Sequence, residues 1–277
     1  MVILSAFADE ISPDLNEQLD VMEAEGIRHI ELRSAWKTGV LRLSEEQLAT
    51  IKKETDRRGF KIASIGSGLG KYDINAPFES ELNDIEIAIN TAKFFGADKI
   101  RVFSYWDKSE GGDVLAHRDT VMTRMKALAA AAQVGGVTLG HENEGHIYGE
   151  QPAQCRDILD TVNSPHLKAI FDPANFIQAG VMPYEEAWPM LKDDIVYFHI
   201  KDALRETRKV TPAGEGDGGL PQILKEKLVD EGWEGMLSLE PHLNIPGPDG
   251  EKSGPLSFKA AVDGLTKVLD DLGVKYE

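Results

Sequence analysis

The chain has 277 residues, of which 42% are hydrophobic and 28% are charged, and its formal net charge at pH 7 is −17. This length and composition are typical of a globular protein with a full hydrophobic core. The acidic balance and the lack of a basic stripe in the sequence argue against binding to nucleic acid, because phosphates need clustered cations. An anionic membrane surface is disfavoured as a partner for the same reason.

A single cysteine, Cys155, excludes an internal disulfide bond and fits a reducing compartment. The N-terminal residues MVILSAFADE lack a basic segment and soon become acidic, so they predict a strand rather than a signal peptide. No run of about 18 apolar residues occurs, so no membrane span is expected. We therefore expect a cytoplasmic protein whose partner is a small molecule. The sequence leaves the oligomeric state open, and a homo-oligomer is compatible with it.

Eight short apolar segments, rich in β-branched and aromatic residues, predict buried strands. In chain order they are Val2–Phe7, His29–Leu32, Lys61–Ile65, Lys99–Phe103, Val137–Glu142, Lys168–Phe171, Ile195–Phe198 and Met236–Leu239. Gly66, Gly68 and Gly70 follow the third segment. Their spacing does not match a nucleotide-binding motif, so we expect a flexible loop there.

Each predicted strand is followed by a stretch with helical periodicity. Ser12 and Pro13 are expected to begin the first helix, which runs to Gly26. Residues Ser44–Gln47 form a capping box at the start of the second helix, which ends near Gly59. The last helix carries apolar residues at helical spacing, namely Phe258, Ala261, Val262, Leu265, Leu269 and Leu272.

This alternation of strand and helix repeats through the whole chain and predicts an α/β fold. Eight parallel strands with right-handed crossovers can close into a (β/α)8 TIM barrel. An open, doubly wound sheet is the main alternative, but it would need a boundary in the middle of the chain, and no linker is present. We therefore predict a single TIM barrel domain over residues 1–277.

Four successive predicted strands end in a residue that can bind a metal, namely Glu142, Asp172, His199 and Glu240. In a TIM barrel the C-terminal ends of the strands surround one pocket, so these side chains are expected to converge. Three carboxylates in one pocket repel one another, and a divalent cation relieves that repulsion. Three oxygen ligands and one imidazole suit Mn²⁺, Zn²⁺, Mg²⁺ or Co²⁺, so we expect one divalent metal ion.

Four segments in the second half of the chain, GHENEGHIYGE, AIFDPANF, YFHIKDA and LSLEPH, resemble the xylose-isomerase-like TIM barrels. The resemblance is to a bacterial group of sugar phosphate isomerases and epimerases, related to ketose 3-epimerases and type IV apurinic endonucleases. It implies that the metal ligands are the four residues just named. It also implies that Arg205 contacts the substrate.

Two positions depart from the epimerase pattern. Asn175 stands where the epimerases have a substrate-contacting histidine, and Tyr148 stands where they have a second glutamate. The resemblance therefore supports the metal site more strongly than the epimerase substrate. His141 should face the helix layer by strand alternation, as a structural residue. Candidates for substrate contacts, each also explained by packing or solvation, are Lys71, Glu144, His146, Asn175, Lys201 and Trp106.

These patterns predict a metal-dependent isomerase or epimerase that moves a proton next to the carbonyl group of a sugar or sugar phosphate. The metal ion would stabilise the enediolate, and Glu142 and Glu240 would serve as base and acid on opposite sides of the reacting carbon. The alternatives are a metal-dependent lyase or hydrolase of the same barrel family acting on an oxidised sugar, and a non-catalytic sugar-binding barrel. An apurinic endonuclease is disfavoured, because only His199 of the seven histidines is placed as a ligand.

Overall fold

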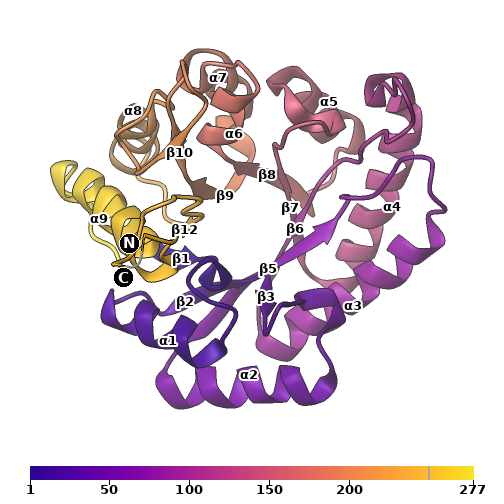
Figure 1. The fold of residues 1–277 in the computed structure, drawn as a ribbon. Helices are drawn as coiled ribbons and strands as arrows, with labels where there is room; N and C mark the ends of the chain where they lie inside the picture. Colours follow the sequence, from indigo (N-terminus) through magenta and orange to yellow (C-terminus); the bar gives the residue numbers. More distant parts are fainter. Residues whose placement is uncertain (249) are drawn as a thin grey trace.

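Eight parallel strands close into a barrel in the order β1-β12-β9-β8-β7-β6-β5-β2 (Figure 1). This computed structural model describes residues 1–248 and 250–277. The barrel strands are β1 (Ile3–Ala6), β2 (His29–Leu32), β5 (Lys61–Leu69), β6 (Lys99–Val102), β7 (Thr138–Glu142), β8 (Leu167–Phe171), β9 (Ile195–Ile200) and β12 (Met236–Leu239). The closed parallel barrel confirms the predicted fold class.

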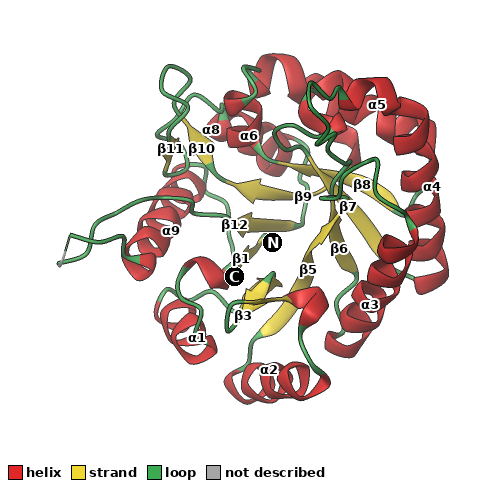
Figure 2. Cartoon of the chain, turned by 45° about the vertical axis from the view of Figure 1, so that its right-hand side comes forward, coloured by secondary structure: helices red, strands yellow, loops and turns green. Residues whose placement is uncertain are grey.

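Helices surround the barrel and connect its strands (Figure 2). The α-helices are α1 (Leu15–Ala24), α2 (Glu45–Arg58), α3 (Glu79–Phe95), α4 (Arg118–Gly135), α5 (Pro152–Val162), α6 (Pro173–Gln178), α7 (Trp188–Leu191), α8 (Leu220–Leu224) and α9 (Gly254–Asp271). The shorter 3-10 or π-helical turns are η1 (Ala8–Glu10), η2 (Val40–Arg42), η3 (Val114–His117), η4 (Tyr148–Glu150), η5 (Pro183–Ala187), η6 (Lys192–Asp194) and η7 (Lys225–Asp230). Two small antiparallel pairs join β3 (Ser34–Ala35) to β4 (Thr38–Gly39) and β10 (Asp202–Ala203) to β11 (Val210–Thr211). In the described parts of the chain, no helix has both the length and the apolar composition of a membrane span.

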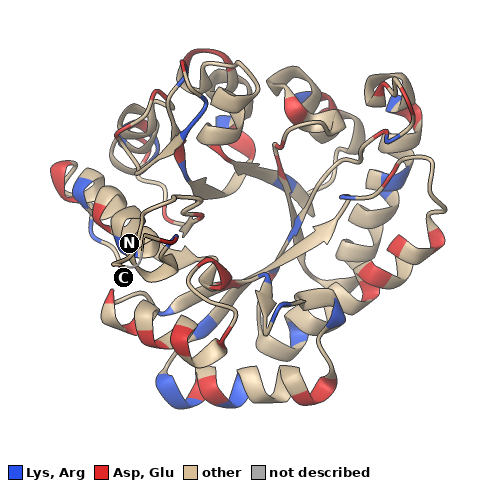
Figure 3. Ribbon diagram, in the orientation of Figure 1, with Lys and Arg blue, Asp and Glu red and all other residues tan. Residues whose placement is uncertain are grey.

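Acidic and basic side chains are interspersed on the outer helices, and Figure 3 shows both colours along α2. Within α2, Lys52 pairs with Asp56, and Arg57 pairs with Glu54. Exposed pairs of this kind contribute little to stability, about 0.3–0.5 kcal/mol each. They distribute the charge of the helix, so α2 presents no basic stripe to a polyanion.

Apolar side chains from alternate strand positions fill the interior of the barrel below its C-terminal end. Ile170, Tyr197 and Met236 form a buried cluster there. A Cβ atom on Gly140 would lie 2.5 Å from Cγ1 of Ile170, so a larger residue would displace this cluster. Because close-packed side chains fill the barrel at this level, they support the polar residues at the C-terminal strand ends.

The first helix begins later than predicted. Its N-cap residue is Asp14 and not Ser12, because the carboxylate of Asp14 accepts two backbone N–H groups of the first turn. Ser12 Oγ instead accepts the N–H group of Asp14 and fixes the preceding turn. The second helix follows the prediction: Ser44 and Gln47 form both hydrogen bonds of a capping box.

Strand β5 is longer than predicted, and the expected loop at residues 66–68 is wrong. These residues continue the strand, with a shift in register against β6 between Ile65 and Leu69. A Cβ atom on Gly66 would lie 2.7 Å from Cε1 of Phe7. The glycine therefore lets an irregular strand pass close to its neighbours. In the sequence, glycines that serve this purpose look the same as glycines of a loop.

We expect the close packing at Gly70 to be measurable against a matched glycine. Gly70 and Gly136 both have left-handed backbone, with φ of +79° and +70°, but only a Cβ atom at Gly70 would overlap the backbone of Phe103. Gly136→Ala should lower the free energy of unfolding by about 1–2 kcal/mol through its backbone alone. Gly70→Ala should lower it by at least about 1 kcal/mol more through overpacking. Urea denaturation measures the free energy of unfolding of both variants. An equal decrease in the two variants would contradict the close packing at Gly70.

Candidate metal centre and active site

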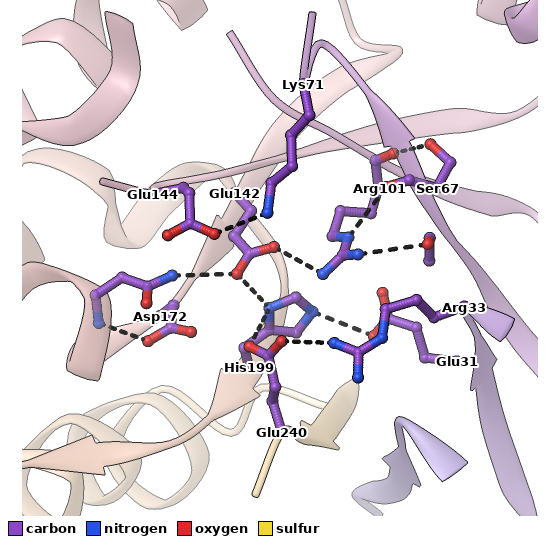
Figure 4. Close-up of polar contacts among 12 residues, drawn as sticks. Glu31, Arg33, Ser67, Lys71, Arg101, Glu142, Glu144, Asp172, His199 and Glu240 are labelled. Atoms are coloured by element: carbon purple, nitrogen blue, oxygen red, sulfur yellow. Dashed lines mark hydrogen bonds and ion pairs between the residues drawn. The ribbon is translucent and has the colours of Figure 1, made fainter. Parts of the chain in front are cut away.

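Four ligand-type side chains meet at the C-terminal end of the barrel, where the sequence predicted them (Figure 4). Glu142 ends β7, Asp172 follows β8 as the N-cap of α6, His199 lies on β9, and Glu240 follows β12. One ligand atom from each lies within 4.8 Å of the others, and all four residues are buried. We call these four residues the quartet.

The quartet contains two buried polar atoms without a hydrogen-bond partner. His199 Nδ1 lies 3.0 Å from Glu142 Oε1 and 3.9 Å from Glu240 Oε2, but it makes no hydrogen bond. Asp172 Oδ2 accepts no hydrogen bond either, although Lys201 Nζ lies 3.0 Å away. An unpaired buried polar atom costs about 1–3 kcal/mol. A divalent cation among these oxygen and nitrogen donors would give both atoms a partner, so the residues present fit a metal ion.

Two arginines hold the outer oxygens of the two glutamates. Arg101 Nη1 lies 3.1 Å from Glu142 Oε2, and Arg33 Nη1 lies 3.1 Å from Glu240 Oε1. Both guanidinium groups stack on the ring of Phe7, at 4.8 Å and 4.4 Å from its centroid respectively. Each glutamate thus keeps one oxygen toward the quartet while a cation fixes the other.

Neither arginine was predicted from the sequence. Arg101 lies inside the apolar segment KIRVF, where alternation alone does not distinguish the barrel interior from the helix layer. Its guanidinium also donates to the carbonyl oxygens of Gly66 and Ser67, so the irregular part of β5 forms its binding site. Arg33 follows β2 and also pairs with Asp9. The usable signal was a charged residue within or directly after an apolar strand.

Lys201 is the third cation beside the quartet. Its Nζ lies 2.9 Å from Glu240 Oε2 and 3.0 Å from Asp172 Oδ2, and the residue is buried. Burial opposes the charge, but the two carboxylates outweigh it and raise the pKa of Lys201 above its ordinary value. Lys201 was predicted as a substrate contact, and the structure places its ammonium group between two members of the quartet.

The charges of the site set the ionisation of the quartet. Burial alone would raise the pKa of Glu142, but the charges of His199 and Arg101 lower it to about 2. Burial raises the pKa of Asp172 to about 6 despite the charge of Lys201. Burial opposes the charge of His199, but the neighbouring carboxylates raise its pKa to about 10. The carboxylates of the quartet therefore stabilise positive charge at its centre.

Three of the predicted substrate contacts lie beside the quartet. Asn175 Nδ2 donates to Glu142 Oε1 at 3.2 Å. Lys71 Nζ and Glu144 Oε2 form an ion pair of 2.9 Å, drawn next to Glu142 in Figure 4. Lys71 Nζ also lies 4.1 Å from the centroid of the Phe103 ring. The opposite charges of these two candidates therefore neutralise each other.

Three further candidates, Arg205, His146 and Trp106, lie farther out. Within residues 1–248 and 250–277, no hydrogen bond or ion pair joins any of their side chains to the quartet. Arg205 is exposed, and its backbone N–H donates to Asp217. His146 is exposed, and the ring of Trp106 faces Lys108 Nζ at 4.6 Å. A substrate contact by these three residues stays a prediction.

Two residues near the quartet point away from it. His141 Nε2 lies 2.9 Å from Ser104 Oγ, and burial lowers the pKa of His141 to about 4, so it is neutral at pH 7. This confirms the structural role expected from strand alternation. Tyr148 Oη donates to Asp157 on α5 at 2.6 Å, so the position where epimerases have a second glutamate faces the helix layer here.

Glu31, on β2, was also missed. It is fully buried, and its Oε2 lies 3.2 Å from His199 Nε2, on the opposite side of the imidazole from the quartet. The sequence places it between Ile30 and Leu32 in a short strand. Like Arg101, it is a charged residue in an apolar strand, and a strand pattern does not show which neighbour it will meet across the barrel.

A buried carboxyl, Glu81, lies beneath the turn that carries Lys71. Glu81 belongs to the first turn of α3, and its Oε1 accepts the backbone N–H of Gly70 at 2.7 Å. Its Oε2 has no hydrogen-bond partner. Burial raises the pKa of Glu81 to about 7, although the hydrogen bond from the backbone N–H of Gly70 acts to lower it. The turn is therefore fixed by a group that ionises near neutral pH.

Comparison with known proteins identifies one family. A family model described as the xylose isomerase-like TIM barrel matches residues 19–263. No curated protein matches the chain.

Solved structures of similar fold cover almost the whole chain. A probable 3-DHS dehydratase, AsbF, from Bacillus anthracis has 18% sequence identity and a TM-score of 0.74, covering 96% of this chain and 99% of that one. A D-tagatose 3-epimerase-like protein has 16% identity and a TM-score of 0.74, covering 98% of each. A xylose isomerase-like TIM barrel protein from Mycobacterium smegmatis in complex with magnesium has 19% identity and a TM-score of 0.67, covering 97% of each. At these identities the likeness establishes the fold.

We expect Glu81→Gln to stabilise the protein at pH 8 and to have little effect at pH 4.5. The pKa of about 7 in the folded state lies above the ordinary 4.5. Between these two pKa values the folded wild type keeps a proton on Glu81 that the unfolded chain has released. The free energy of unfolding of wild type therefore falls as the pH rises through this range. The pKa shift corresponds to a change of at most about 3 kcal/mol in the free energy of unfolding. Urea denaturation at both pH values tests this, with the exposed Glu86→Gln on the same helix as control. A difference that does not change with pH would contradict the assignment.

Proposed function

Because the chain belongs to the xylose isomerase-like TIM barrel family, we propose that it is a divalent-metal-dependent sugar isomerase or epimerase. Its substrate would be a sugar or sugar phosphate, and its reaction would transfer a proton next to the carbonyl group through an enediolate. The observation that carries the proposal is the buried quartet, whose ligand atoms lie within 4.8 Å of one another. Support comes from the structures of similar fold, one named as 3-epimerase-like and one holding magnesium.

Glu142, Asp172, His199 and Glu240 would hold one Mn²⁺, Zn²⁺, Mg²⁺ or Co²⁺ ion. When bound, such an ion polarises substrate oxygens and stabilises the negative charge that develops when the neighbouring C–H is deprotonated. Neighbouring cations keep Glu142 and Glu240 ionised at neutral pH, since both have a lowered pKa. An ionised carboxylate is the form that a general base requires.

Glu142 and Glu240 would handle the proton on opposite sides of the reacting carbon. Glu142 Oε2 is held by Arg101 and Glu240 Oε1 by Arg33, so neither carboxylate rotates freely. Removal of a proton by one glutamate and delivery by the other inverts the carbon, which is epimerisation. Return of the proton to the neighbouring carbon is aldose–ketose isomerisation. Asn175, which donates to Glu142, would contact the same substrate.

A second candidate reaction is elimination, as in a lyase. After the same deprotonation, a hydroxyl group next to the enediolate can leave as water if a proton is supplied. The glutamate that removed the C–H proton would return it to the leaving hydroxyl. Lys201 favours this reading, because its buried ammonium, 2.9 Å from Glu240 Oε2, would stabilise negative charge on the leaving oxygen. The name of one structure of similar fold, a probable dehydratase, agrees with it. Product analysis distinguishes loss of water from a change of configuration.

We expect the purified protein to bind about one divalent ion per chain and to melt at a lower temperature in chelator. Ligand binding stabilises the folded state by roughly 2.7 kcal/mol at a hundredfold excess over Kd. Scanning calorimetry with Mn²⁺ or Zn²⁺, and with EDTA, measures the shift. Asp172→Asn should abolish the shift, whereas the exposed Glu86→Gln should keep it. The site assignment fails if none of these ions binds to wild type or changes its melting temperature.

We expect Glu142→Gln and Glu240→Gln, each saturated with metal, to lower turnover of a ketose by about 10²–10⁴-fold, because each loses a positioned acid or base. Incubation with a ketose panel in D₂O, followed by NMR, separates proton exchange from product formation. In an epimerase one variant should still exchange a substrate proton without completing turnover. Wild-type rates in both variants would exclude the glutamates as acid and base. Ligand binding without any exchange in wild type would indicate a non-catalytic sugar-binding barrel.

A further inference from the structure

The imidazole of His199 contacts a different group through each of its nitrogens. Nδ1 faces the quartet, 3.0 Å from Glu142 Oε1, and has no hydrogen-bond partner. Nε2 faces away from the quartet and lies 3.2 Å from Glu31 Oε2. Both His199 and Glu31 are fully buried, so water cannot substitute for either partner without rearrangement.

Glu31 is itself fixed from a second direction. Its Oε1 accepts a hydrogen bond from Tyr197 Oη at 2.7 Å, and Tyr197 Oη lies 3.2 Å from Ser64 Oγ. Glu31 lies on β2, whereas Tyr197 and His199 lie on β9, and two other strands separate β2 from β9 around the barrel. The contact therefore crosses the barrel interior and is not a by-product of strand pairing.

Ring packing and the Glu31 contact constrain His199 in different ways. The ring of Phe7 packs edge-on at 5.1 Å between centroids, and the ring of Tyr197 at 5.5 Å. These contacts fix the plane of the imidazole, but an apolar ring does not distinguish a protonated nitrogen from an unprotonated one. A carboxylate does, because an ionised carboxylate only accepts hydrogen bonds. A hydrogen bond to Glu31 requires a proton on Nε2.

We infer that Glu31 is a positioning residue that fixes His199 with its proton on Nε2 and the lone pair of Nδ1 directed at the metal ion. The inference rests on the proposed metal-dependent function, and it names the ligating atom and the residue that selects it. A carboxylate hydrogen-bonded to a metal-bound histidine orients the ring and makes the ligating nitrogen more basic. Glu31 thus acts on the metal through His199, without touching the substrate.

The test measures binding of Zn²⁺ alone, by titration calorimetry of the full-length protein. Glu31→Leu removes the acceptor, and Glu31→Gln keeps the shape and an acceptor but removes the charge. Loss of such a partner typically weakens metal binding by about 10–100-fold. We expect about 100-fold for Glu31→Leu and about tenfold for Glu31→Gln. Tyr197→Phe is the matched control, because it keeps the ring against His199 and the Glu31–His199 contact, and it should weaken binding less than either variant.

A spectroscopic readout separates positioning from general destabilisation. In protein labelled with ¹⁵N-histidine and loaded with Zn²⁺, the signals of His199, assigned by their absence in His199→Gln, should show a protonated Nε2 and a metal-bound Nδ1. In Zn²⁺-loaded Glu31→Leu, the Nε2 proton of His199 should lack its carboxylate acceptor, so the ¹⁵N chemical shift of Nε2 should differ from that of wild type. If Glu31→Leu does not fold, Glu31→Gln carries the test.

Three results would overturn the inference. Unchanged Zn²⁺ affinity in the folded Glu31 variants would show that the contact does not act on the metal. Ligation through Nε2 in wild type would show that the assigned atom is wrong. In either case the proposed metal-dependent function would still stand. Failure of wild type itself to bind any divalent ion would overturn both the inference and the function on which it rests.

Discussion

The structure is organised by the need to balance buried negative charge at one end of the barrel. Glu142, Asp172 and Glu240 converge within a few ångströms, in an interior where their repulsion is poorly screened. Arg101 and Arg33 each neutralise one outer oxygen, and Lys201 bridges two of the acids. The inner oxygens still face one another around His199 Nδ1, which lies 3.0 Å from Glu142 Oε1 but makes no hydrogen bond. Positive charge at that point would balance the remaining carboxylate oxygens, and the proposed divalent ion would supply it.

Much of the fold was predictable, because the buried strands are short apolar segments and the helices have clear periodicity. The quartet was predictable for a related reason: each member ends a strand, and the barrel gathers strand ends. Glu31 and Arg101 were not, because they lie within apolar strands and their partners are distant in sequence. The glycines at 66 and 68 gave a wrong prediction, since an irregular strand and a loop can share the same composition.

The two glutamates of the quartet lie in different surroundings. The partner of Glu142 is Arg101, whose side chain is 6% exposed, so this side of the site is sealed by protein. The partner of Glu240 is Arg33, whose side chain is 26% exposed, and His242 lies 3.4 Å from the same carboxylate with 44% exposure. The site therefore has a closed side and a side open to solvent. Under the proposed function, a substrate that enters from solvent would reach the Glu240 side of the site first.

The long sequence separation of these contacts determines when the site can form. Arg33 and Glu240 are 207 positions apart, and the barrel closes only when β1 pairs with β12, the first strand with the last. No partly folded chain that lacks β12 can assemble the four ligands. Under the proposed function, a metal ion could therefore not nucleate folding of this barrel, since its binding site is absent before closure. An ion bound after closure would slow unfolding, so metal supply would change the kinetic lifetime of the folded protein and not its folding rate.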